Sequence, residues 1–198
     1  AEIARMTVLR MDLKVEPTDA FLAWAPMYHM GGSDHTLSSM MMGAPVIITD
    51  GLDLDAMVDA IACHQLGWLL LMPATIQPLL KRIIESDTQV RGIRVVGSSA
   101  DMLPAALIAE TSALLNAPFA NSFGATETGL PPATAHLIPI GVAPTNLDKQ
   151  RSSLCEFRIV DDQDRDVTAG EVGEIIVRGP TLFSGYWDAS EVNAKDFR

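Results

Sequence analysis

The chain has 198 residues and a formal net charge of −11, with 48% hydrophobic and 20% charged residues. This balance is that of an ordinary globular protein with a buried core. The acidic charge, without any cluster of Lys and Arg, argues against nucleic acid or an anionic membrane as a partner. No apolar run approaches the roughly 20 residues that a membrane helix needs, so we expect no integral membrane segment.

The first two thirds of the chain alternate between apolar strands and helices. Residues 1–20 are amphipathic and partly helical. Short apolar segments typical of buried strands follow at residues 20–26, 45–50, 68–73, 93–99 and 117–124. Helical spacing separates them at residues 36–43, 52–67, 75–87 and 103–116, and we expect the first two of these helices to end at Gly43 and Gly67. This alternation predicts an α/β fold with a largely parallel sheet flanked by helices.

The pattern changes near residue 138. Two strand-like segments, expected over Cys155–Val160 and Glu174–Arg178, are separated by a turn-rich stretch without an intervening helix. This spacing favours antiparallel pairing. We therefore expect an α/β subdomain over residues 1–138 and a smaller, barrel-like antiparallel β subdomain over residues 139–198, incomplete at its C-terminal end.

Four unusual clusters each follow an expected strand. They are Pro26–Gly32, Pro73–Thr75, Gly97–Ala100 and Phe123–Glu127. The carboxyl ends of parallel strands meet at one edge of a sheet, where ligands of such sheets bind. The clusters therefore predict one binding cleft.

The residue types in these clusters point to a nucleotide. The small residues Gly97–Ala100 could hold a flat ring against the backbone while Phe123 stacks on its other face, although the same residues could simply form a tight turn. Thr126 and Glu127 offer the hard oxygen ligands that suit Mg²⁺ bridged to phosphate, or they simply begin a helix or loop. His29 could line a substrate pocket or be a core histidine.

Other kinds of site find less support. A zinc site from His29, Asp34 and His35 lacks a further ligand, and the chain has no GxxxxGK[ST] phosphate loop. Cys63 and Cys155 have no CxxC spacing, which is typical of structural thiols in a reducing compartment. The run Met40–Met42 is expected in the core.

Read together and in order, five motifs carry a resemblance. "PMYHMGG", "GSSADMLP", "NSFGATETG", "IGVAP" and "GEVGEIIVRGPTLFSGYWD" resemble the adenylate-forming superfamily of acyl-CoA synthetases, aryl-CoA ligases, luciferases and peptide-synthetase adenylation domains. The resemblance covers about residues 19–198. It implies that a carboxylic acid and ATP form an acyl-adenylate and pyrophosphate, and that coenzyme A then takes the acyl group.

The resemblance also implies roles for individual residues. Thr126 would contact phosphate, and Glu127 would hold Mg²⁺; these two are the expected catalytic residues. His29, Met30 and Gly31 would belong to the acyl pocket. The nucleotide site would comprise Gly97, Ser98, Ser99, Ala100, Asn121, Ser122, Phe123, Gly124 and Thr126.

The chain also departs from the family pattern. Phe123 replaces the usual Tyr, which keeps the stacking face and loses a hydroxyl. The family's loop ending in Pro-Lys-Gly, its Thr-Gly-Asp motif and its C-terminal domain with a catalytic Lys are not in the sequence. We therefore expect the central fragment of such an enzyme, not competent for the full reaction as cut.

The expected protein is a cytoplasmic ligase that uses ATP, Mg²⁺ and coenzyme A. The absence of an Asp near Pro26 favours a simple fatty or aromatic acid over an amino acid, while the sequence fixes neither the particular acid nor the oligomeric state. Two alternatives are a non-catalytic binding or interaction module that kept this fold, and a dinucleotide oxidoreductase, which would need a glycine fingerprint that the sequence lacks.

Overall fold

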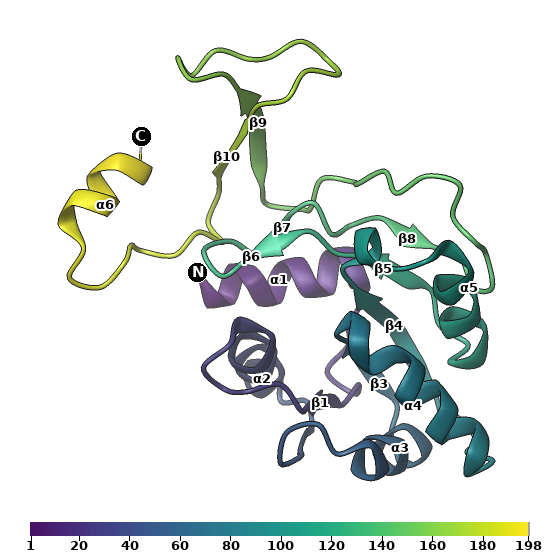
Figure 1. The fold of residues 1–198 in the computed structure, drawn as a ribbon. Coiled ribbons are helices and arrows are strands. Elements are labelled where there is room, and N and C mark those ends of the chain that lie inside the picture. Colours follow the sequence, from purple (N-terminus) through teal and green to yellow (C-terminus); the bar gives the residue numbers. More distant parts are fainter. Residues whose placement is uncertain (198) are drawn as a thin grey trace.

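The computed structural model describes residues 1–197 and begins with helix α1 (Glu2–Leu13). Strands and helices then alternate, as the sequence predicts (Figure 1). The strands are β1 (Phe21–Ala23), β2 (Val46–Ile48), β3 (Leu66–Leu70), β4 (Ile93–Ser98) and β5 (Phe119–Asn121). The helices between them are α2 (Met30–Met42), α3 (Leu54–Cys63), α4 (Pro73–Glu85) and α5 (Ala105–Leu114), with a short 3₁₀ turn over Ala100–Met102.

The strands form a largely parallel sheet. β1 pairs with β2 in parallel, and β3, β4 and β5 pair in parallel in that order. A parallel bridge between Ala20 and Leu66 connects the two groups. Strand β8 (Leu137–Ile138) adds an antiparallel edge beside β5. The α/β prediction is confirmed, and the carboxyl ends of β1, β3, β4 and β5 share one edge.

Helices cover both faces of this sheet because side chains alternate along each strand. On one face, α3, α4 and α5 pack against Leu22, Leu69, Val96 and Phe119. On the other, α1 packs against a second cluster that includes Phe21, Trp68, Val95 and Ala120.

Three details of the helices differ from expectation. Helix α2 begins at Met30, earlier than residue 36, because His29 caps it, and it ends as predicted at Gly43, where φ is 72°. Helix α3 ends at Cys63, so Gly67 does not terminate it. Gly67 lies inside β3, where a Cβ atom would come within 2.7 Å of Val15. Met40 and Met41 are exposed rather than in the core, because α2 turns them away from the sheet.

The later part of the chain is built mainly from small antiparallel pairs. The sequence did not predict β6 (Gly124–Ala125) and β7 (Gly129–Pro132), which pair across a tight turn. The expected strands β9 (Glu156–Val160) and β10 (Glu174–Arg178) are confirmed and pair antiparallel. They form a hairpin that projects from the body, and helix α6 (Ser190–Asp196) follows it (Figure 1). Within residues 1–197 the strands close no barrel, so the expected barrel-like form is not seen.

The segment between β8 and β9 runs along the α/β part. The Gly141 amide donates to Ser112 Oγ at 2.9 Å, and the Ser153 amide donates to Asp12 Oδ2 at 2.9 Å. The division between residues 138 and 139 stays a prediction. In residues 1–197, no helix is both long enough and apolar enough to cross a membrane.

Candidate functional site

A cavity of about 490 Å³ lies at the carboxyl ends of the strands. Its wall includes residues from all four clusters that the sequence singles out: His29–Gly31 after β1, Pro73 after β3, Ser99 after β4, and Phe123, Gly124 and Thr126 after β5. We call it the strand-end cavity. The expected convergence of these clusters is therefore seen in the structure.

His29 stands at the rim of the cavity as the N-cap of α2. Its Nδ1 accepts a hydrogen bond of 2.9 Å from the Gly31 amide, which satisfies a donor that the helix itself leaves free. The chain is tightly folded here, since a Cβ atom on Gly32 would lie 2.5 Å from the Pro26 carbonyl oxygen. His29 is exposed and is not a core histidine.

The Gly97–Ala100 cluster contributes to the site unequally. Only Ser99 lines the strand-end cavity, while Gly97, Ser98 and Ala100 are buried. Gly97 lies under the indole of Trp68, where a Cβ atom would come within 2.2 Å of Cη2. Ser98 uses its carbonyl oxygen to accept from the Ser122 amide and hydroxyl, at 3.3 and 3.1 Å. Ser99 is thus the one member of this cluster on the cavity surface, and the other three lie behind it in the core.

Asn121 is fully buried, and its side chain is already hydrogen-bonded within the protein. Its Nδ2 donates to the Leu147 carbonyl at 2.9 Å, and its Oδ1 accepts from Lys149 Nζ at 2.5 Å. Lys149 also bonds Asp101 at 2.7 Å and lies 5.9 Å from the centre of the Phe123 ring. Sequence reasoning missed Lys149, because no local pattern places residue 149 beside residues 101, 121 and 123.

Thr126 and Glu127 lie in the turn between β6 and β7. The Thr126 carbonyl accepts from Arg5 Nη2 at 3.0 Å, and the Glu127 carbonyl accepts from the Phe183 amide at 2.9 Å. Thr126 lines the strand-end cavity, whereas Glu127 lines a neighbouring cavity of about 400 Å³. The turn therefore separates the two residues into adjoining spaces.

The Glu127 carboxylate has a partner from the end of the chain. Tyr186 donates its hydroxyl hydrogen to Glu127 Oε1 at 2.8 Å. This hydrogen bond is the largest cause of a raised pKa of Tyr186, so the phenol is a proton donor at neutral pH. Tyr186 belongs to the "GYWD" part of a motif quoted above, but nothing in the motif indicated that it reaches Glu127.

His35 and Trp68 form the inner wall of the strand-end cavity. His35 is buried, and its ring centre lies 5.5 Å from that of Phe21 and 6.1 Å from that of Trp68. Burial lowers the pKa of His35 from 6.5 to about 4, so the imidazole is neutral at pH 7. His35 follows the N-cap His29 by six residues, about 1.7 helical turns, and sequence reasoning did not connect this spacing with the cavity.

The residues fit a magnesium ion only together with a nucleotide. In residues 1–197, no group of three His, Cys, Asp or Glu side chains could hold a metal ion. Mg²⁺ is commonly held by one or two carboxylates, with phosphate oxygens and water completing its shell. Glu127 could supply one such carboxylate.

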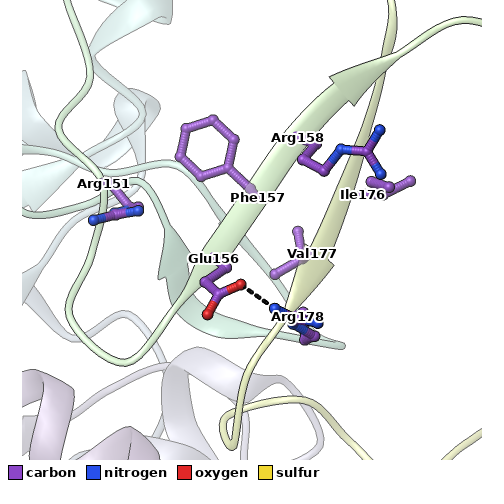
Figure 2. A pocket seen from close by; sticks show the side chains of 7 residues that line it. All are labelled: Arg151, Glu156, Phe157, Arg158, Ile176, Val177 and Arg178. Carbon is purple, nitrogen blue, oxygen red and sulfur yellow. Dashed lines mark hydrogen bonds and ion pairs between the residues drawn. The ribbon is translucent and has the colours of Figure 1, made fainter. Parts of the chain in front are cut away.

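A separate hollow of about 450 Å³ lies on the β9–β10 hairpin (Figure 2). Arg151, Arg158 and Arg178 line it together with apolar side chains, and Arg178 is paired with Glu156 at 2.5 Å. It shares no lining residue with the strand-end cavity. We therefore do not include it in the candidate site.

A comparison with protein-family models identifies the family of this chain. The model of the AMP-binding enzyme family matches residues 2–187. The chain belongs to the AMP-binding enzyme family. This family assignment agrees with the resemblance carried by the five sequence motifs.

The related proteins are CoA ligases. The chain is 29% identical to indoleacetate–CoA ligase of Aromatoleum aromaticum over 178 residues, which covers 89% of this chain and 34% of that protein. It is 24% identical to the medium/long-chain-fatty-acid–CoA ligase FadD8 of Mycobacterium tuberculosis, covering 99% of this chain and 34% of the relative. The chain thus spans about a third of the length of these relatives.

Solved structures share the fold. O-succinylbenzoate coenzyme A synthetase of Bacillus subtilis, solved in complex with ATP and magnesium, matches with a TM-score of 0.77 at 20% identity. The match covers all of this chain and 40% of that one. The comparison shows that the two proteins share the same α/β fold.

Proposed function

We propose that this chain supplies the nucleotide and acyl-binding walls of an AMP-forming CoA ligase. The observation that carries the proposal is the strand-end cavity, where four separate clusters meet in a member of the AMP-binding family. The reaction joins a carboxylic acid to ATP as an acyl-adenylate and then transfers the acyl group to coenzyme A.

The nucleotide would use the Phe123 side of the cavity. Phe123 is 40% exposed, so its ring is available to stack on adenine, with Ser99 of the Gly97–Ala100 cluster on the same cavity wall. The edge of the adenine ring would lie beside Asn121, Ser122 and Gly124. Access of adenine to the Asn121 amide would require the Lys149 contact to move.

The phosphates would lie toward the β6–β7 turn. Thr126 would bind phosphate, and Glu127 would hold Mg²⁺ on a nucleotide that reaches both adjoining cavities. A bound Mg²⁺ would offset the charge of the phosphates and orient them. In this chain, the turn itself is fixed through the backbone bonds to Arg5 and Phe183, which would limit its movement during the reaction.

The acyl group would occupy the part of the cavity near α2. His29, Met30 and Gly31 lie at its entrance, while Trp68 and neutral His35 lie further in. The indole of Trp68 and the neutral imidazole of His35 suit a fatty or aromatic acid. The names of the two relatives, one an indoleacetate ligase and the other a fatty-acid ligase, include both classes. Free thiols at Cys63 and Cys155 are compatible with the cytoplasm as the location.

The test is ATP–pyrophosphate exchange in the complete ligase, measured with a panel of aromatic and fatty acids. We expect exchange that depends on one of these acids, and a loss of about a hundredfold or more in Glu127→Ala, because the metal loses its protein ligand. Glu110→Ala, which removes an exposed carboxylate from α5, serves as the matched control and should retain full exchange.

Two results would contradict the proposal. Exchange that is absent with every acid would instead favour a non-catalytic module that kept the fold. Full exchange in Glu127→Ala would show that the metal is held elsewhere.

A further inference from the structure

The Glu127 side chain makes one hydrogen bond within residues 1–197, and it comes from a distant part of the sequence. Tyr186 Oη lies 2.8 Å from Glu127 Oε1. A second contact joins the same two segments, since the Phe183 amide donates to the Glu127 carbonyl at 2.9 Å. Both the backbone and the carboxylate of Glu127 are therefore tied to the segment that follows β10.

Tyr186 is itself held in place. The Asn193 side chain accepts from the Tyr186 amide at 2.8 Å and donates to the Tyr186 carbonyl at 2.9 Å. The Tyr186 ring packs edge-on against Phe183 with ring centres 4.8 Å apart, and Phe183 also contacts Phe197 at 5.3 Å. The backbone of Tyr186 and one edge of its ring are therefore held in place, and they position the hydroxyl beside Glu127.

We propose that Tyr186 is a positioning residue that orients the Glu127 carboxylate for a magnesium–nucleotide. The inference rests on the proposed function, since it takes Glu127 as the metal ligand. The hydrogen bond occupies Oε1 and limits rotation of the carboxylate, so Oε2 would remain available to bind the metal. Hydrogen bonds that orient a metal ligand raise affinity because less freedom is lost when the ion binds.

The test variant is Tyr186→Phe, which removes the hydroxyl and keeps the ring against Phe183. Its matched control is Trp187→Phe, which removes the polar group of the adjacent, 98% exposed ring. In the complete ligase, titration calorimetry measures the binding of Mg-ATP and, with EDTA present, of AMP, and a thermal scan gives the unfolding midpoint.

We expect Tyr186→Phe to weaken Mg-ATP binding about three- to tenfold and to leave metal-free AMP binding and the thermal midpoint unchanged. Trp187→Phe should change none of these. In the complete ligase, the KM for Mg-ATP should rise while the KM for the carboxylic acid stays constant. A purely structural role of Tyr186 would instead weaken both nucleotides alike.

A second comparison uses Glu127→Gln alone and combined with Tyr186→Phe. If Tyr186 acts through Glu127, the double variant should bind Mg-ATP no more weakly than Glu127→Gln alone. Additive losses, unchanged Mg-ATP binding in Tyr186→Phe, or tighter binding in that variant would each overturn the inference. A different result would contradict the proposed function itself, namely that the unaltered ligase shows no ATP–pyrophosphate exchange with any carboxylic acid.

Discussion

Two histidines six residues apart have opposite environments. His29 is exposed and caps α2, whereas His35 is 5% exposed and lies between the rings of Phe21 and Trp68. The pKa of His35 falls to about 4 because burial penalises the charged ring. His35 therefore acts as an uncharged wall of the cavity and not as a proton carrier at neutral pH.

This burial predicts a loss of stability in acid. An unfolded chain protonates His35 near pH 6.5, while the folded protein does so only near pH 4, so the unfolded state binds more protons between these values. The contribution to the free energy of unfolding is fully present above about pH 6.5. It should fall by about 3 kcal/mol as the pH drops to about 4, with no further loss below that. Urea unfolding at a series of pH values measures it.

The His35 contribution is isolated by comparing variants. In the His35→Phe variant, the fall in stability between pH 6.5 and 4 should disappear. His64 is an exposed histidine after α3, and the control variant His64→Gln should still show this fall. Identical pH profiles in the unaltered protein and His35→Phe would show that His35 is protonated normally in the folded state.

At the level of elements, a buried ion pair joins the first two helices. Arg5 on α1 and Asp34 on α2 lie 2.6 Å apart, with side chains 8% and 12% exposed. Arg5 also donates to the carbonyls of Thr126 and Thr181, at 3.0 and 2.9 Å. One guanidinium thus connects two helices to the β6–β7 turn and to the segment after β10.

We expect Asp34→Ala to destabilise the protein by about 1–3 kcal/mol, because it removes the nearer of the two carboxylates paired with buried Arg5 and leaves only the more exposed Glu2, at 3.6 Å. Chemical denaturation gives the free energy of unfolding. The control is Glu85→Ala, which breaks the Lys81–Glu85 pair, whose side chains are 76% and 54% exposed. That change should cost no more than about 0.5 kcal/mol. Equal effects of the two changes would contradict a special role for the buried pair.

The order and type of the main elements could be predicted from sequence. Apolar strands such as β4 and amphipathic helices such as α4 carry periodic signals that local composition determines. Boundaries were less predictable, since the start of α2 depends on His29 acting as a cap and the role of Gly67 depends on its approach to Val15.

The cavity could be predicted from the sequence because parallel strands place their carboxyl ends together. The long-range contacts that hold its residues in place could not be predicted. Arg5 meets Thr126 across 121 residues, and Tyr186 meets Glu127 across 59. Such contacts depend on how the whole chain packs and leave no local pattern in the sequence. The same holds for Lys149, which donates a hydrogen bond to the side chain of Asn121 from 28 residues further along the chain.

At the level of the whole molecule, we expect the 198-residue chain by itself to bind Mg-ATP with millimolar affinity or weaker. It spans about a third of the length of its relatives, and its net charge of −11 repels the phosphates. Millimolar binding corresponds to about −4 kcal/mol, which stacking on Phe123 and a few polar contacts could provide. Titration calorimetry measures the affinity, and a micromolar dissociation constant would contradict this expectation.

The projecting β9–β10 hairpin has a consequence for how copies of the chain behave toward one another. Apart from a bridge at Val160, no other strand lies beside its outer edges within residues 1–197. An open strand edge is a template for pairing with a strand of another molecule. Glu156, Arg158 and Arg178 place charges along these strands, and mixed charges on an edge discourage such pairing. The ion pairs of the hairpin are exposed and contribute little to folding, whereas their charges disfavour edge-to-edge pairing between two copies of the chain.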